Sequence, residues 1–195
     1  MCSSDLAEDE QTLVEAICRI VCEDAGYRMA WVGYAEQDDD KTLRPVAAAG
    51  VGIEYLAQAG LTWADSAHGR GPSGSTIRSG SIEVIEDFET DERVDPWREG
   101  TLQLGYRSAI ALPLKDGNSR TFGVLSIYSE ETAAFSAEEQ RLLAELADDL
   151  AFGIVTLRTR IEHNLAEEQI RIAATAFEAQ EGIMITDVAP TASCA

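Results

Sequence analysis

The sequence predicts an α+β domain that ends in a helix too long to be contained within it. Three observations support this fold class. Two pairs of segments alternate apolar and polar residues, an amphipathic helix precedes them, and a stretch nearly free of glycine and proline begins at Ser136. Strands that pair as hairpins are antiparallel, so the expected core is an antiparallel sheet with helices packed on it.

Composition restricts the partners that the protein can have. The chain has 195 residues, 45% of them hydrophobic, which is typical of one globular domain with an additional segment. A formal net charge of −20 repels phosphate backbones and anionic lipids, so neither nucleic acid nor a membrane is an expected partner. No apolar stretch approaches the ~20 residues of a spanning helix, and the acidic N-terminus is unlike a signal peptide. The predicted location is the cytoplasm.

The first half of the chain contains a helix and a hairpin. Residues 7–25 are predicted to be helical, because apolar residues recur at spacings of three and four and Gly26 follows them. Alternation over residues 27–35 and 42–49 predicts the two strands of the first hairpin. A short helix is expected over residues 53–59, between two glycines.

The second half begins with a polar, irregular segment over residues 61–71 and ends its sheet with a second hairpin. Short helices are predicted where a glycine closes a brief segment, and strands where apolar and polar residues alternate. The expected elements are helices over 73–79 and 96–104 and strands over 82–85, 107–114 and 121–129.

A capping box predicts where the long helix starts. The Ser136 hydroxyl can accept a hydrogen bond from the amide of Glu139, and the Glu139 carboxylate can accept one in return from the amide of Ser136. The helix is expected to run to about residue 176. At ~1.5 Å per residue, some 40 residues span about 60 Å, more than a compact domain can bury.

Apolar residues on this helix follow a heptad spacing. They are Leu143, Ala147, Leu150, Ile154, Leu157 and Ile161. The heptad would continue at Asn164, which is polar, and the apolar seam resumes instead at Leu165, an offset that resembles a stutter in a coiled coil. We therefore expect a parallel homodimer that pairs at least over the second half of the helix. The alternative is a helix that folds back on its own sheet.

Residues 68–74, with the sequence HGRGPSG, match the spacing G-x-G-x-x-G of dinucleotide-binding loops. That chemistry requires a buried strand before the first glycine and a full helix after the third. Here a polar segment precedes Gly69, and only five residues separate Gly74 from Gly80. The motif is therefore interpreted as a bend and not as a phosphate site.

Residues with catalytic potential are sparse. His163 lies on the long helix but lacks the surroundings of a kinase phosphate acceptor, so it is interpreted as a solvated residue. Cys18 and Cys22 share one helix face, and no second pair of ligands stands at zinc spacing, so they are interpreted as buried thiols and no metal site is expected.

The motifs between Gly69 and Ser129 resemble a GAF domain. They are Gly69–Gly74, Ile77–Gly80, Ile82–Asp87, Asp95–Arg98, Leu104–Ser108, Ala111–Leu114 and Phe122–Leu125. The resemblance covers about residues 7–158 and is greatest to GAF domains that precede PAS, GGDEF and EAL domains in bacterial signalling proteins. It divides the chain into a disordered or artefactual tail (1–6), the GAF domain (7–158), a coiled-coil linker (159–176) and the start of a PAS domain (177–195).

The resemblance implies an antiparallel sheet of five or six strands, with helices on both faces. The first and last helices would cover one face, and a pocket on the other face would be roofed by residues 61–80 and 86–105. Pockets commonly combine aromatic walls with a few convergent polar groups. The candidate pocket residues are therefore Trp63, His68, Arg70, Arg78, Trp97, Arg98, Tyr106, Arg107 and Ser108.

The resemblance also restricts the ligand. No cysteine stands between Cys22 and Cys194, so a covalent bilin is not expected. Tyr128 and Ser129 occupy the place of an Asn-Lys pair in cyclic-nucleotide GAF domains, and a haem would depend on His68 alone, so neither ligand is favoured. The ligand or cofactor stays unknown.

The predicted function is a non-catalytic sensory module. A small ligand or a partner would bias the roof, and the change would pass through a dimeric C-terminal helix, with Leu143, Leu150, Ile154, Leu157, Ile161 and Asn164, to an output domain in the same chain. One alternative is a dimerisation scaffold with a collapsed pocket. Another is an enzyme on the same fold, such as the free methionine sulfoxide reductases, which need paired roof cysteines.

Overall fold

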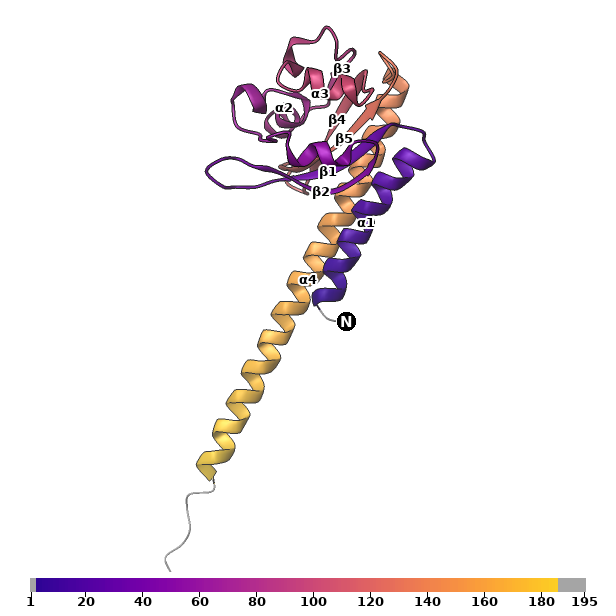
Figure 1. Cartoon of the computed structure of the whole chain (residues 1–195). Coiled ribbons are helices and arrows are strands. Elements are labelled where there is room, and N and C mark those ends of the chain that lie inside the picture. The colour runs from indigo at the N-terminus through magenta and orange to yellow at the C-terminus, as the bar shows by residue number, and fades with distance from the viewer. Residues whose placement is uncertain (1–2, 186–195) are drawn as a thin grey trace, which may run out of the picture.

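A five-stranded antiparallel sheet forms the centre of the protein (Figure 1). The computed structural model describes the backbone from Ser3 to Ile185 and the side chains of residues 9–172. The strand order is β2-β1-β5-β4-β3, so the last strand in sequence lies at the centre of the sheet. The strands are β1 (Met29–Ala35), β2 (Leu43–Gly50), β3 (Glu83–Ile85), β4 (Ser108–Lys115) and β5 (Thr121–Ser129).

The two hairpins predicted from the sequence are confirmed, and β1 and β5 join them. These two strands pair antiparallel from Met29 opposite Tyr128 to Tyr34 opposite Gly123. Because successive side chains of a strand point to opposite faces, each strand contributes to two separate cores. Ala30 and Val32 belong to one core, and Met29 and Trp31 belong to the other.

Two long helices cover the first face of the sheet. They are α1 (Ser3–Glu23) and α4 (Ala137–Ile185), which lie side by side in Figure 1. The core beneath them includes Val14 and Cys18 from α1, Leu125 and Ile127 from β5, and Ile154 from α4. The predicted placement of the first and last helices on one face is therefore confirmed.

Short elements cover the opposite face and form the roof of a second, aromatic core. They are η1 (Ile53–Ala57), η2 (Ala67–Gly69), α2 (Pro72–Ser79), η3 (Glu92–Val94) and α3 (Arg98–Gln103). Two expectations change in detail. The helix expected over residues 53–59 is a 3-10 helix, and the one expected over residues 96–104 begins two residues later.

The predicted capping box opens α4. The Ser136 amide donates to Glu139 Oε2 at 3.0 Å, and the Glu139 amide donates to Ser136 Oγ at 3.3 Å. The helix continues without interruption through Gly153, where a side-chain Cβ would lie 3.0 Å from Leu13 Cδ2. Glycine at this position therefore allows α1 and α4 to pack closely.

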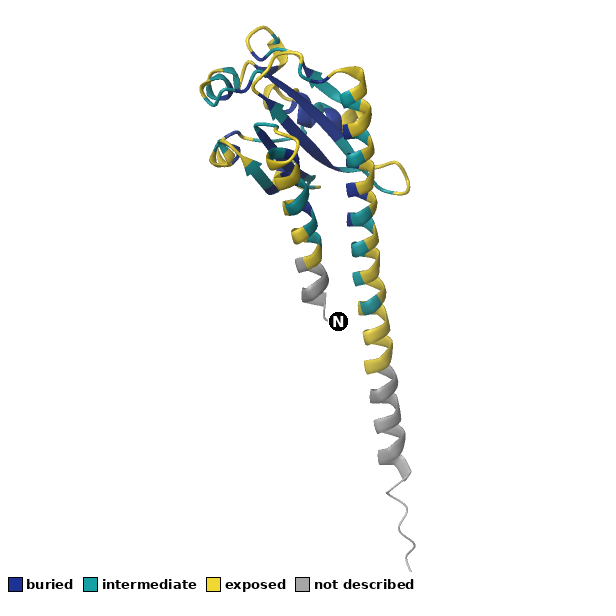
Figure 2. Ribbon diagram, turned by 90° about the vertical axis from the view of Figure 1, so that its right-hand side faces the viewer, coloured by how far each residue is buried: buried dark blue, intermediate teal, exposed yellow. Residues whose placement is uncertain are grey.

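Burial along α4 ends partway down the helix (Figure 2). Leu143, Leu150 and Ile154 are buried against α1 and the sheet. Over this part of its length, α4 therefore packs on its own domain, as in the alternative to the homodimer. A partner helix cannot contact these three side chains in this conformation. Leu157, Ile161 and Asn164 are partly exposed, and side chains 165–172 are exposed. The predicted pairing surface is thereby confined to the second half of the helix.

Both ends of the described chain are helical. Helix α1 begins at Ser3, within the segment expected to be a tail, and α4 extends to Ile185, beyond the expected end near residue 176. The first strand of the predicted PAS domain falls partly on this helix and partly on residues 186–195, which lie outside the described part. No helix within residues 3–185 has an apolar stretch long enough to cross a bilayer.

Candidate ligand-binding site

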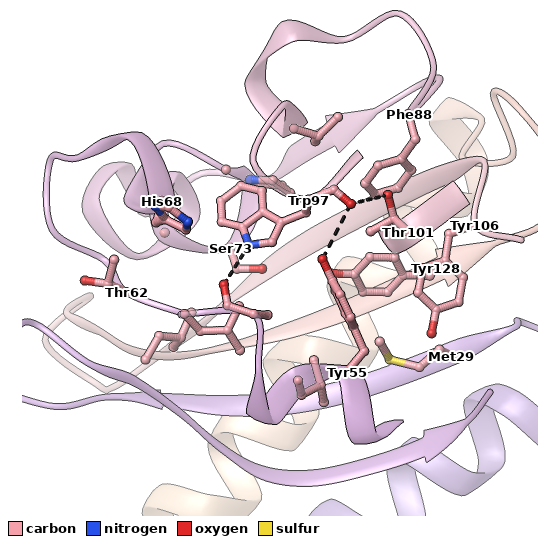
Figure 3. A pocket seen from close by; sticks show the side chains of 18 residues that line it. Met29, Tyr55, Thr62, His68, Ser73, Phe88, Trp97, Thr101, Tyr106 and Tyr128 are labelled. Carbon is pink, nitrogen blue, oxygen red and sulfur yellow. Dashed lines mark hydrogen bonds between the residues drawn. The ribbon is translucent and has the colours of Figure 1, made fainter. Parts of the chain in front are cut away.

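A small cavity lies between the sheet and the roof (Figure 3). Its volume is about 40 Å³, enough for a few water molecules at ~10–15 Å³ each, whereas pockets for drug-sized ligands span roughly 300–1,000 Å³. The lining is mostly aromatic, with Tyr55, Phe88, Trp97, Tyr106 and Tyr128. Among the described residues that line the cavity, none is Lys, Arg, Asp or Glu. The site therefore offers apolar contacts and neutral hydrogen-bonding groups.

The floor of the cavity comes from the central strands. Tyr128 of β5 lies opposite Met29 of β1, and both side chains face the cavity. The Tyr128 ring packs against Phe88 and Tyr106, with ring centroids 5.9 and 4.9 Å away. Burial raises the pKa of Tyr128 to about 12, against a smaller lowering by Trp31, so the phenol stays protonated at neutral pH.

Next to Tyr128, the buried indole N–H of Trp31 lacks a hydrogen-bond acceptor among the described residues. An indole nitrogen can only donate, so Trp31 cannot accept the phenol proton of Tyr128. The unpaired Trp31 indole costs about 1–3 kcal/mol, as does any buried polar group without a partner. The Tyr128 hydroxyl lines the cavity and forms no hydrogen bond to an acceptor in the described part of the chain, so it can donate to an added acceptor.

The roof holds Trp97 and Tyr55 over the floor. Trp97 Nε1 donates to the Ala59 carbonyl at 2.7 Å, and the Tyr55 hydroxyl makes a longer contact of 3.5 Å with the Trp97 carbonyl. His68 lies at the exposed rim, edge-on to the Trp97 ring at 5.7 Å between centroids. Within the described part of the chain, the Trp97 indole and the Tyr55 hydroxyl are thus each held by a single hydrogen bond.

The glycine motif of residues 68–74 serves close packing. A Cβ at Gly71 would lie 2.5 Å from the Trp97 ring, so glycine lets this ring rest on the backbone. A Cβ at Gly69 would lie 1.7 Å from the Ala64 carbonyl oxygen. The motif is therefore part of the roof, in agreement with its interpretation as a bend.

Arginine side chains brace the roof from outside the cavity. Arg78 Nη1 donates to three loop carbonyls, those of Trp63, Ala64 and Gly69, at 2.9, 3.1 and 2.6 Å. Arg98 donates to the carbonyl of Asp91 at 2.8 Å and also to Glu89 and Asp95. These guanidinium groups fix loops and do not line the cavity.

The remaining candidates divide between the cavity and other sites. His68, Trp97 and Tyr106 line the cavity. The others bond elsewhere: Arg70 to Asp65, Arg107 to Asp87 and Glu89, Trp63 to the Glu36 carbonyl and Ser108 to the Glu131 carbonyl.

Several lining residues were not among the sequence-based candidates. Met29 and Tyr128 could have been found, because the alternation of the two strands places them on the same face as Trp31. Tyr55, Phe88 and Thr101 come from the roof segments, where no periodic pattern indicates which side chains point inward.

The described cysteines lie far from this site in the fold. Cys18 and Cys22 are on α1, which covers the opposite face of the sheet. Burial raises the pKa of the Cys18 thiol to about 12, so it is a poor nucleophile at neutral pH. Cys2 and Cys194 lie outside the described side chains. Cys18 and Cys22 therefore do not contact the cavity.

Comparisons with known proteins give a consistent result. The family model described as GAF domain matches residues 7–155. The structure is similar to the GAF domain region of a protein from Geobacter sulfurreducens PCA, with a TM-score of 0.66, 21% identity and coverage of 78% of this chain and 97% of the other.

Two further structures are similar at lower identity. One is a GAF domain/HD domain protein from Geobacter sulfurreducens, with a TM-score of 0.63, 15% identity and coverage of 82% and 99%. The other is a type II free methionine-R-sulfoxide reductase from Thermoplasma acidophilum, with a TM-score of 0.60, 19% identity and coverage of 77% and 95%. At these identities the likeness establishes the fold. The curated proteins gave no match to the chain.

Proposed function

This chain belongs to the GAF domain family, and from that premise we propose that it is a non-catalytic sensory module that binds a small ligand beneath its roof. One observation carries the proposal. The paired strands β1 and β5 form the cavity floor on one face, and on the other face they pack against the helices α1 and α4. A shift of these strands on ligand binding would reach α4 through the neighbouring α1 and β4 and through Arg158 of α4, which lies 4.4 Å over the Tyr34 ring of β1.

In this proposal, the conformational change passes out of the domain along α4 at Arg158, near the point where the helix stops being buried. Arg158 of α4 donates to Glu10 of α1 at 2.7 and 2.9 Å, and Tyr34 of β1 donates to the same carboxylate at 2.6 Å. This clamp connects β1 to both helices near the point where α4 leaves the domain. A ligand can shift such an equilibrium only by binding one arrangement better than the other.

An alternative proposal is a dimerisation scaffold, and the cavity volume of about 40 Å³ favours it. In that case the second half of α4 would pair with a second copy and the roof would stay closed. An enzyme on this fold, as among the reductase neighbours, would need nucleophiles at the roof. The described cysteines lie on the other face of the sheet.

A glycine substitution tests the relay without any ligand. Gly71→Ala would press a methyl group against the Trp97 ring and displace the roof, whereas Gly117→Ala adds a methyl group where nothing lies within 4 Å. Hydrogen exchange of both full-length variants is compared with that of the wild type. We expect Gly71→Ala alone to alter exchange in the roof and in residues 158–172.

Two results would count against the sensory proposal. If exchange changes in the roof and stays unchanged in α4, the relay is wrong and the scaffold is favoured. If Gly117→Ala changes α4 to the same extent, the effect does not pass through the roof.

A further inference from the structure

The absence of charge in the cavity lining, among the described residues, restricts what could bind there. The chain carries 35 acidic residues, yet none lines the cavity, and the arginines nearby are occupied with loop carbonyls and carboxylates. A charged ligand would lose its water without gaining an opposite charge. Pro72 and Ser73, at the N-terminus of α2, line the cavity. The helix dipole there would stabilise an anion by less free energy than the anion loses when it gives up its water. The lining therefore favours a neutral molecule.

Two hydroxyl groups in the cavity, those of Tyr128 and Tyr55, can donate a hydrogen bond to a ligand. Tyr128 lines the cavity, and its hydroxyl forms no hydrogen bond to an acceptor in the described part of the chain; its neighbour Trp31 can itself only donate. Figure 3 shows the Tyr55 side chain reaching toward Tyr128, and among the described residues its hydroxyl forms one hydrogen bond, the long one to the Trp97 carbonyl. Ser73 is already paired with Ser126 at 2.9 Å. Two neutral phenols are thus positioned for one acceptor oxygen.

The aromatic side chains that line the cavity favour a flat, ring-shaped ligand. Phe88 and Tyr128 are stacked with an interplanar angle of 18°, and Tyr106 packs beside them. Aromatic pairs of this kind stabilise a further ring placed against them. The cavity is too small for such a ring unless a side chain moves. Trp97 is the side chain that we expect to move, because its ring rests on Gly71 and its indole is held by one hydrogen bond.

We propose that this pocket binds a small, uncharged aromatic molecule that carries a carbonyl oxygen. The ring lies against Tyr128 and Phe88, the oxygen accepts hydrogen bonds from Tyr128 and Tyr55, and the Trp97 ring moves aside to make room. This inference rests on the proposed function, since it assumes that the cavity is a ligand site.

Benzamide and benzoate make a matched pair of probes, because they share a shape and differ in charge. Their binding to the full chain is measured by titration calorimetry at neutral pH, with tryptophan fluorescence as a report on Trp97. We expect benzamide to bind and benzoate to bind at least about tenfold more weakly, because the carboxylate must lose its water without meeting an opposite charge in the cavity. Trp97→Ala should strengthen benzamide binding by removing the ring that must move.

Three variants test the placement of the oxygen. Tyr128→Phe and Tyr55→Phe should each weaken benzamide binding several-fold to about tenfold while leaving the fold intact. Tyr27→Phe is the control, because Tyr27 stacks on Phe135 in the core of the opposite face and should bind benzamide like the wild type.

The outcomes separate this inference from the proposed function. Benzoate binding as tightly as benzamide, unchanged affinity in Tyr128→Phe, or no benzamide binding even by Trp97→Ala would each overturn the ligand class. None of these results affects the Gly71→Ala experiment, which uses no ligand. A relay that fails there while benzamide binds as expected would instead overturn the sensory function alone.

Discussion

At the scale of single residues, arginine side chains decide the shape of the roof. Arg78 lies on α2, one of the shortest helices, and its guanidinium donates to three carbonyls of residues 63–69 that no strand or helix satisfies. A planar, permanently charged donor suits such convergent carbonyls better than a lysine ammonium. The sequence identifies Arg78 as important but not its role, because a surface ion pair, a ligand anchor and a loop brace share the same residue type.

Arg78→Met should therefore loosen the roof. Hydrogen bonds from a charged donor contribute roughly 1.5–3 kcal/mol each, and exposure of Arg78 reduces this, so we expect a total loss of about 1–3 kcal/mol in the free energy of unfolding. Urea unfolding gives this value, and hydrogen exchange should increase in residues 61–71.

The matched control for this variant is Arg70→Met. Arg70 lies in the same loop and is exposed, and within the described part of the chain its guanidinium pairs with the exposed Asp65 at 2.9 Å, so its loss should leave the free energy of unfolding nearly unchanged. Equal effects of the two substitutions would mean that the carbonyl contacts of Arg78 add nothing.

At the scale of secondary-structure elements, the sheet and the long helix were the predictable part of the fold. Alternation over residues 121–129 matches β5 residue for residue, and the Ser136 capping box fixes the start of α4. The roof was less predictable, because its conformation depends on contacts distant in sequence, such as Trp97 with Ala59 and Gly71. Periodic patterns report burial on a face and carry no information about such contacts.

The same limit explains the partial overlap of the candidate site with the cavity. Trp97 and Tyr106 were identified as large aromatic residues near a predicted pocket, and they line it. The arginines were chosen as polar anchors by the same reasoning, yet they donate to loop carbonyls outside the cavity. The sequence does not show which carbonyls a loop leaves unpaired.

The clamp of Glu10, Arg158 and Tyr34 is the element-scale contact with a measurable strength. Burial alone would raise the pKa of Glu10, but the hydrogen bonds from Arg158 and Tyr34 and the charge of Arg158 lower it overall. A double-mutant cycle of Glu10→Gln and Arg158→Met should give a coupling energy of about 1 kcal/mol at neutral pH. Arg158 is 37% exposed, which keeps the value modest.

The pH dependence of that coupling follows from the sign of the shift. A carboxyl with a lowered pKa in the folded state contributes fully above its unfolded value of about 4.3, and this stability is lost as pH falls through the folded value. The exposed pair Arg141–Glu145 on α4, at 2.6 Å, is the control and should couple by only about 0.3–0.5 kcal/mol. A Glu10–Arg158 coupling no larger than this would show that the clamp does not hold α4.

At the scale of the whole molecule, charge is distributed unevenly between the domain and the projecting helix. The chain carries a net charge of −20, yet residues 157–172 hold three arginines and three glutamates and are neutral. The same stretch exposes Leu165, Ile170 and Ile172, which are 46, 70 and 60% accessible. Two copies would therefore repel each other through their domains, while this part of α4 offers a neutral, apolar strip for pairing.

This distribution leads to a prediction about the homodimer that we propose. Pairing along the second half of α4 should tighten as the salt concentration rises, because salt screens the repulsion between the domains. The Debye length falls from about 10 Å at 0.1 M to about 3 Å at 1 M.

Leu165→Asp should dissociate the dimer by placing a charge in the strip. Leu142→Asp is the control, because Leu142 is similarly exposed, at 50%, but lies on the part of α4 that packs on the domain. Sedimentation equilibrium of both full-length variants at two salt concentrations measures the association. If Leu142→Asp dissociates the dimer and Leu165→Asp leaves it intact, the interface lies on the domain. The proposal that the projecting helix is the pairing element would then be wrong.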